Sequence, residues 1–142
     1  TYWLDKSPSL FVDPLYDSVS SVWLLIIAMV VIAPIYEELV FRGVIWSALK
    51  EQFAIRFDKT ELSKAEGLVQ SEAHGALMAS LITSLVFAVM HLQYGLYEIS
   101  TIVVLALIFC YARYKSGSLF LPIALHIFNN GLAMWQYLAQ AA

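Results

Sequence analysis

Four long stretches of this chain contain no charged residue, and they constrain its fold more than any other feature. They run from Ser18 to Tyr36, Ala73 to Tyr97, Ile99 to Ala112 and Ser116 to Ala142. A helix needs about 20 mostly apolar residues to cross the roughly 30 Å hydrocarbon core of a bilayer. Two stretches meet this length outright; the first meets it by including Glu37, Glu38 and Arg42, and the third by adding its flanks. We therefore expect an all-α, polytopic membrane helical bundle of about four transmembrane helices.

The overall composition excludes several other classes of protein. Hydrophobic residues make up 61% of the chain and charged residues only 13%, whereas soluble domains carry about 25% charged residues. The net charge is −3 and the eight Lys and Arg residues form no basic face, which argues against a nucleic-acid partner. The single cysteine, Cys110, excludes a disulfide framework.

The polar segments divide the chain into a lead-in and one membrane domain. Residues 1–17 are turn-rich and predict an interfacial lead-in, and residues 18–142 predict a single transmembrane helical domain. We expect this domain to be the core of a longer protein. A charged stretch, residues 50–72, predicts a water-exposed loop. The expected helices span about 20–49, 74–93, 97–114 and 119–140.

The basic residues predict the orientation of the domain. With four crossings, the first and third connections share one side of the membrane and hold six Lys or Arg residues, against Lys6 alone on the other side. Cytoplasmic loops carry the excess of Lys and Arg. The sequence therefore predicts a cytoplasmic loop at 50–72 and both termini outside.

Seven polar residues lie inside or at the ends of the apolar stretches, where lipid is expected. A charged side chain at the centre of a helix in the bilayer costs about 2.5–3.5 kcal/mol on insertion scales. Such residues face a cavity or pair with one another. They are Glu37, Glu38, Arg42, His91, His126, Asn129 and Asn130.

Helical geometry gives the two glutamates different partners. Glu38 and Arg42 are four residues apart, the spacing of an ion pair within one helix. Adjacent residues point about 100° apart on a helix, so we expect Glu37 and Glu38 not to face one site. Glu37 then has no local partner, which suits a general base.

The other polar residues follow the same spacing. His126 and Asn130 are four residues apart and present an imidazole and an amide on one helix face, whereas Asn129 points elsewhere. His91 follows Phe87 by four residues, which predicts a ring against the imidazole.

Two prolines lie about one turn before polar residues. Pro34 precedes Glu37 by three residues and Pro122 precedes His126 by four. We expect each proline to interrupt the helical hydrogen bonds and free a carbonyl. His91 falls near the outer end of its helix, so that helix must be tilted or offset if these residues share a site.

Three motifs follow one another on successive apolar segments. Residues 37–42 fit EExxxR, residues 87–91 fit FxxxH and residues 126–130 fit HxxxN. In this order they resemble the CAAX protease and bacteriocin-processing (CPBP or Abi) family of intramembrane proteases, which includes the type II CAAX prenyl endopeptidases. The resemblance covers residues 30–135.

The resemblance implies a membrane-embedded endopeptidase of a bacterial inner membrane whose active site opens to the cytoplasm. Its partners would be a peptide or lipid-modified peptide substrate and membrane lipid. Carried over to the matching positions, Glu37 activates a water with help from His91, and His126 with Asn130 binds the oxyanion. The supporting residues are Glu38, Arg42, Phe87 and Asn129.

Three alternatives remain open. Family members have also been described as metalloproteases, and Glu37, His91 and His126 could complete a zinc site; we favour a mechanism without a cofactor. The polar cluster could instead hold helices together in a non-catalytic bacteriocin-immunity or scaffold protein. A proton relay or transporter fragment is disfavoured because no internal repeat is visible.

Overall fold

The computed structural model describes residues 14, 18, 21–58 and 66–141, and this part of the chain contains helices and no strands. The expected lead-in, residues 1–17, lies outside the described residues except at Pro14. Residues 59–65 of the charged connection also lie outside them. The domain boundary at residue 18 stays a prediction.

The first membrane helix is longer than expected and contains two π-helical segments. It continues beyond residue 49 to Asp58 without interruption. Its consecutive parts are α2 (Val22–Ile27), η1 (Ala28–Ile32), α3 (Ala33–Glu38), η2 (Leu39–Ile45) and α4 (Trp46–Asp58).

Pro34 accounts for the first π segment. Proline has no N–H, so it cannot donate to the carbonyl one helical turn earlier. The N–H of Ala33 donates to Ala28, five residues back, which shifts the hydrogen bonds by one position. In this shifted register an N–H at position 34 would donate to the carbonyl of Met29, but proline has no N–H to give. The chain stays helical, and one carbonyl becomes available to a side chain from another helix.

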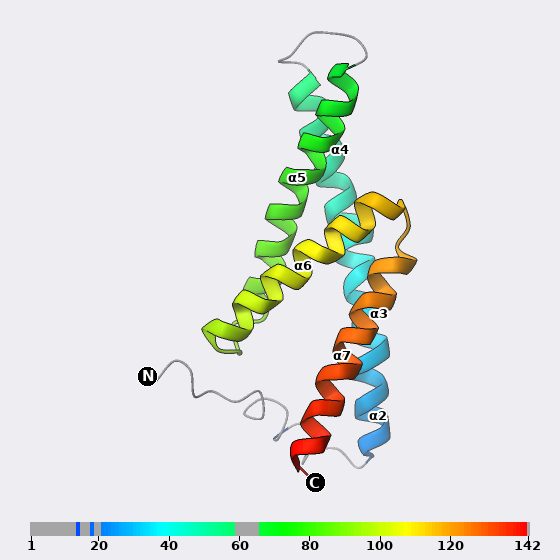
Figure 1. The fold of residues 1–142 in the computed structure, drawn as a ribbon, viewed down its shortest axis with the longest axis vertical. Coiled ribbons are helices and arrows are strands. Elements are labelled where there is room, and N and C mark those ends of the chain that lie inside the picture. Colours follow the sequence, from blue (N-terminus) through cyan, green and yellow to red (C-terminus); the bar gives the residue numbers. More distant parts are fainter. Residues whose placement is uncertain (1–13, 15–17, 19–20, 59–65, 142) are drawn as a thin grey trace.

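The charged connection extends both flanking helices instead of forming a long loop. α5 (Glu66–Val89) begins before His74 and ends four residues before Gln93. It packs along α4 as a hairpin that projects beyond the other helices (Figure 1). A Cβ at Gly75 would overlap the carbonyl oxygen of Lys50, so glycine permits this close approach.

The last two helices meet at a tight turn and then diverge. α6 (Leu96–Ser116) ends at Gly117, whose φ of 65° is the left-handed conformation that glycine adopts without strain. The hydroxyl of Ser118 accepts the N–H of Phe120 at the start of α7 (Phe120–Ala141). α7 runs along η1 and α3, while α6 crosses obliquely toward the end of α5 (Figure 1).

Within the part of the chain that the structure describes, three helical segments are long and apolar enough to cross a membrane: Val22–Arg56, Gln70–Val89 and Leu96–Ser116. α7 has 22 residues but is not among these three. Among the described residues, the charged side chains of Arg42 and Glu38 are the largest that are fully buried, and they lie with aromatic and small residues, while many large apolar side chains are exposed. This distribution fits an integral membrane protein, whose exterior faces lipid and whose polar groups face inward.

Candidate active site

A fully buried ion pair lies at the junction of α3 and η2. Arg42 Nη1 donates to Glu38 Oε1 at 2.9 Å, and both side chains have an exposed fraction of 0%. Arg42 Nη2 donates to the carbonyl of Ala106 on α6 at 3.0 Å. The predicted pairing of Glu38 with Arg42 is confirmed, and the same guanidinium also ties α6 to the first helix.

Two aromatic rings enclose the Arg42 guanidinium. Its Cζ lies 4.9 Å from the centre of the Phe87 ring and 5.4 Å from that of Phe109. Cation–π contacts of this kind strengthen when they are shielded from water. Phe87 also packs edge-on against Phe41 at 4.9 Å. The phenylalanine of the FxxxH motif therefore supports the arginine of the EExxxR motif.

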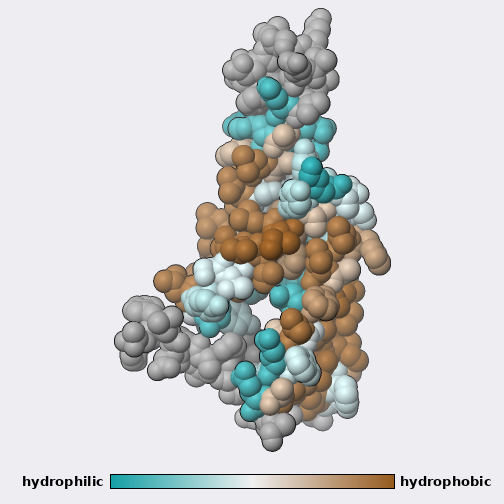
Figure 2. Space-filling view, viewed as in Figure 1, coloured by the Kyte–Doolittle hydropathy of each residue, from teal (hydrophilic) through white to brown (hydrophobic). Residues whose placement is uncertain are grey.

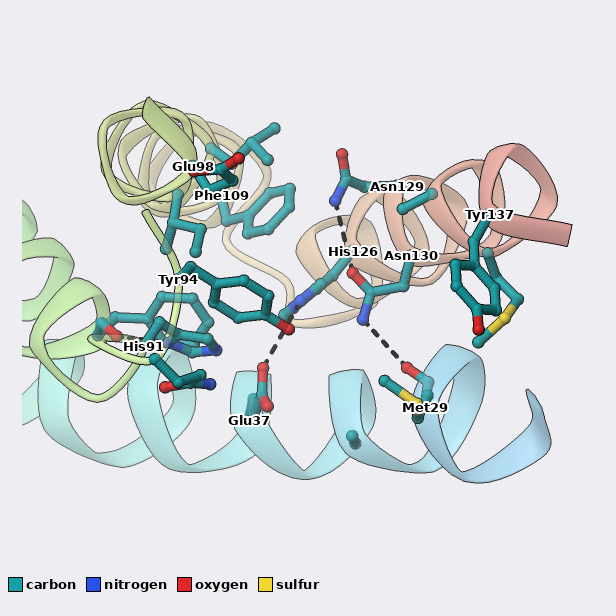
Figure 3. A pocket seen from close by; sticks show the side chains of 17 residues that line it. Met29, Glu37, His91, Tyr94, Glu98, Phe109, His126, Asn129, Asn130 and Tyr137 are labelled. Carbon is teal, nitrogen blue, oxygen red and sulfur yellow. Dashed lines mark hydrogen bonds and ion pairs between the residues drawn. The ribbon is translucent and has the colours of Figure 1, made fainter. Parts of the chain in front are cut away.

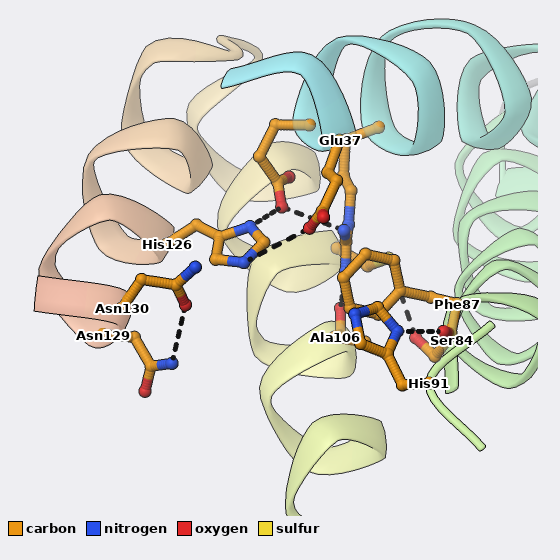
Figure 4. Close-up of polar contacts among 11 residues, drawn as sticks. Glu37, Ser84, Phe87, His91, Ala106, His126, Asn129 and Asn130 are labelled. Atoms are coloured by element: carbon orange, nitrogen blue, oxygen red, sulfur yellow. Dashed lines mark hydrogen bonds and ion pairs between the residues drawn. The ribbon is translucent and has the colours of Figure 1, made fainter. Parts of the chain in front are cut away.

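His126 joins the two glutamates, which corrects the expectation that they do not face one site. Its Nδ1 lies 2.8 Å from Glu38 Oε1, and its Nε2 lies 3.6 Å from Glu37 Oε2 (Figure 4). The two side chains leave the helix in different directions, but the imidazole enters between them. Because each carboxylate reaches a different edge of the ring, adjacent positions can serve one residue.

The two carboxylates differ in exposure to water. The Glu37 side chain is 27% exposed, whereas that of Glu38 is 0% exposed and is held by Arg42 and His126. An ionised carboxylate can only accept hydrogen bonds, so His126 Nδ1 is the donor to Glu38. The opposite nitrogen, Nε2, then faces Glu37.

His91 lies in the turn that follows α5 and not within the helix. Its Nδ1 lies 2.7 Å from the Phe87 carbonyl, and the two rings pack with centroids 4.7 Å apart. This confirms the predicted contact between them. A carbonyl can only accept, so Nδ1 donates and Nε2 is the nitrogen left for other partners.

His91 lies at the level of Glu37 because α5 is offset along the first helix, one of the two arrangements that the sequence predicted. α5 pairs with α4, the far half of the first helix, so α5 ends beside η2 (Figure 1). The contact between Phe87 and Phe41 fixes this level, one turn beyond Glu37. The chain then turns, which brings His91 to the same cavity as Glu37.

Asn130 uses the carbonyl that Pro34 leaves available. Its Nδ2 donates to Met29 O at 3.0 Å, and its Oδ1 accepts from Asn129 Nδ2 at 3.4 Å. The expectation that Pro34 frees a carbonyl is thus confirmed. The same expectation for Pro122 is wrong, because Pro122 lies in the first turn of α7, where N–H groups have no helical partner.

These residues share a cavity of about 450 Å³, a size typical of ligand pockets. Figure 2 shows the molecule hollowed between the diverging parts of α6 and α7. Glu37, His91, His126, Asn129 and Asn130 all line the cavity, as does Phe87. Its walls also include polar residues that our sequence interpretation missed: Gln93, Tyr94, Glu98 and Tyr137 (Figure 3).

The missed residues gave little signal in the sequence. Gln93 and Tyr94 fall at the end of one expected helix and in the connection after it, and Glu98 falls at the start of the next expected helix. Their presence depends on α5 ending at Val89, because the turn that follows lies against the cavity. The sequence signal that could have found Tyr94 is its spacing from His91, because residues three apart lie on one face of a helical turn.

The fit of a metal to this site can be judged from its donors. Across residues 21–58 and 66–141, no group of three or more His, Cys, Asp or Glu side chains is arranged to hold a metal ion. Glu37, His91 and His126 line one cavity without forming such a group. Two His and one Glu are donors that a catalytic zinc site uses, but these side chains are not arranged as one in the described part of the chain.

Comparisons with known proteins agree with the motifs. Residues 19–132 match the family model of the type II CAAX prenyl endopeptidase Rce1-like proteins. A relative from Escherichia coli, the "Uncharacterized 24.3 kDa protein", is 29% identical over 119 residues, which are 83% of this chain and 45% of the relative. The chain thus spans less than half the length of that relative. No solved structure matches significantly.

Proposed function

The chain belongs to the type II CAAX prenyl endopeptidase Rce1-like family, and we propose that it is the core of an intramembrane endopeptidase that uses a glutamate-activated water. The family is one of membrane proteases, and three segments of the chain are able to span a membrane. The substrate is a peptide or lipid-modified peptide bound against the bilayer.

The observation that carries this proposal is the position of His126 between two carboxylates of different exposure. Glu37 borders the cavity, so water can reach it, whereas Glu38 is buried and neutralised by Arg42. A general base must be accessible to the water that it activates. Burial therefore favours Glu37 as the base and gives Glu38 the role of holding His126.

The chemistry needs no serine or cysteine nucleophile. A water near Glu37 and the Nε2 side of His91 gives its proton to Glu37 while its oxygen bonds to the substrate carbonyl carbon. The carbonyl electrons move to the oxygen, and donors stabilise the resulting negative charge. Glu37 then returns the proton to the amide nitrogen as the carbon–nitrogen bond breaks.

His126 and Asn130 are the donors carried by the HxxxN motif. A proton on His126 Nε2 lets the ring donate to the oxyanion while Nδ1 stays on Glu38. The Asn130 amide has two N–H groups, and one of them is directed at Met29 O. The second remains for the oxyanion, with its direction fixed by the first.

The location of the active protein follows from charge. We propose a bacterial inner membrane, with the hairpin of α4 and α5 on the cytoplasmic side, because this hairpin carries Lys50 and Arg56. The site would then open toward the cytoplasmic half of the bilayer.

The proposal is tested with the protein reconstituted in liposomes and two fluorescence-quenched peptides, one ending in a farnesylated CAAX sequence and one identical but unprenylated. We expect cleavage of at least one peptide and a loss of about 10²- to 10⁴-fold in kcat for Glu37→Gln. Glu51→Gln, an exposed glutamate on the same helix, is the matched control and should keep full activity. No cleavage by the wild type, or equal cleavage by Glu37→Gln, would overturn the proposal.

A second candidate is a non-catalytic scaffold, which the full burial of Glu38 and Arg42 favours. In a scaffold, Glu37→Gln has no cleavage to remove and changes only stability or assembly. The same reconstitution distinguishes the two candidates.

A further inference from the structure

Tyr94 is fixed in the wall of the cavity by the turn that carries His91. The N–H of His91 donates to Ala88 O at 2.9 Å, and the N–H of Tyr94 donates to His91 O at 3.1 Å. These bonds place the two side chains on one side of the turn, where their rings lie 6.2 Å apart and inclined by only 18°. The position of Tyr94 is therefore set by backbone and ring contacts and not by its hydroxyl alone.

The Tyr94 ring extends from this turn toward the pair formed by Glu37 and His126 (Figure 3). The ring thus enters the cavity from the turn after α5, on the side opposite α7, and its hydroxyl points toward His126 and Glu37 (Figure 3).

α7 offers few hydrogen-bond donors that are still available to an oxyanion. Stabilising an oxyanion takes preorganised donors aimed at the place where the charge develops. Asn130 has already committed one N–H to Met29 O, and His126 has committed Nδ1 to Glu38. The second N–H of Asn130 remains, and His126 can add a donor at Nε2 when that nitrogen carries a proton. Neither donor comes from the α5 side of the cavity.

We propose that the Tyr94 hydroxyl is an additional hydrogen-bond donor to the tetrahedral intermediate, facing the donors of α7 across the cavity. This inference rests on the proposed endopeptidase function. The hydroxyl donates without giving up its proton, so the water proton still passes to Glu37 and then to the leaving nitrogen.

The electrostatics of the cavity suit a donor that stays protonated. Burial, and then the negative charge of Glu37, raise the pKa of Tyr94 above its ordinary value of 10. The hydroxyl therefore keeps its proton throughout the neutral range.

The test uses Tyr94→Phe, which removes the hydroxyl but keeps the ring against His91. With the same liposomes and peptides, we expect kcat to fall about 10²-fold, the effect of losing one oxyanion donor, with little change in KM. Tyr97→Phe removes an exposed hydroxyl from the first turn of α6 and should leave both constants unchanged. Tyr94→Leu removes the ring as well and should lose at least as much activity.

The outcomes separate this inference from the proposed function. If Glu37→Gln abolishes cleavage but Tyr94→Phe keeps the wild-type kcat, the role of Tyr94 is refuted and the protease stands. A rise in KM at constant kcat would mean uniform substrate binding and would also refute the donor role. A shift of the acidic limb of the pH profile without loss of maximal kcat would show that Tyr94 acts on Glu37 instead. Failure of the wild type to cleave would refute the proposed function itself.

Discussion

Removing one member of the buried Glu38–Arg42 pair should destabilise the protein more than removing both. The three variants to compare are Arg42→Met, Glu38→Gln and the double variant. Arg42→Met removes the bonds to Glu38 and Ala106 and leaves a carboxylate at 0% exposure with His126 as its partner. Glu38→Gln keeps an oxygen for His126 but leaves the guanidinium without its counter-charge.

The magnitudes follow from burial. Breaking a buried ion pair by removing one partner costs about 3–5 kcal/mol, whereas replacing both partners by neutral groups is often nearly neutral. The pair is also imperfectly satisfied, since Glu38 Oε2 and Arg42 Nε are buried without a hydrogen-bond partner among the described residues. We therefore expect each single variant to lose about 3–5 kcal/mol and the double variant less than either.

The free energy of unfolding is measured by titration with sodium dodecyl sulfate in mixed micelles, followed by circular dichroism. Glu72→Gln is the control, because Glu72 is exposed and its pair with Lys50 is long, at 3.7 Å, so this pair should contribute only about 0–1 kcal/mol. We expect a coupling energy of at least about 3 kcal/mol between positions 38 and 42, because the double loss is smaller than either single loss. Strictly additive losses would refute the argument, because they would show that burial of unpaired charge does not set the cost.

Two further predictions concern Asn130 and the cofactor. Pro34→Ala supplies an N–H within reach of Met29 O, which competes with Asn130; kcat should fall by about tenfold to a hundredfold without loss of stability, and adding Asn130→Ala should cost little more. A full additional loss in that double variant would contradict the link between Pro34 and Asn130. Because the cavity side chains do not form a metal ligand set, 1,10-phenanthroline should leave the cleavage rate unchanged. Inhibition that is reversed by added zinc would favour the metal-dependent alternative.

The features that the sequence predicted correctly are set by spacing within one helix. The Glu38–Arg42 pair and the contact between Phe87 and His91 both join residues four apart, and the structure contains both. Local geometry fixes these contacts whatever the neighbouring helices do. The membrane-spanning character of the segments follows from apolar length in the same way.

The features that the sequence did not predict depend on contacts between helices or on irregular backbone. The end of α5 at Val89 comes four residues before the expected end at Gln93, and this early end admits Tyr94 to the cavity. The bond from Asn130 to Met29 needs both the π segment at Pro34 and the position of α7. Residue spacing contains no information about a partner on another helix, so these contacts could not be read from periodicity.

The two glutamates show how a correct local rule leads to a wrong conclusion about a site. Their directions do differ, but the ring of His126 has two nitrogens on different edges, and each glutamate meets one of them. What separates their roles is exposure: Glu38 is enclosed with Arg42, and Glu37 borders the cavity. A buried, paired carboxylate is suited to hold an imidazole, and an accessible one is suited to take a proton from water. The EE pair can therefore combine support and catalysis in consecutive residues, because the helix sends one carboxylate into the protein and the other to its cavity.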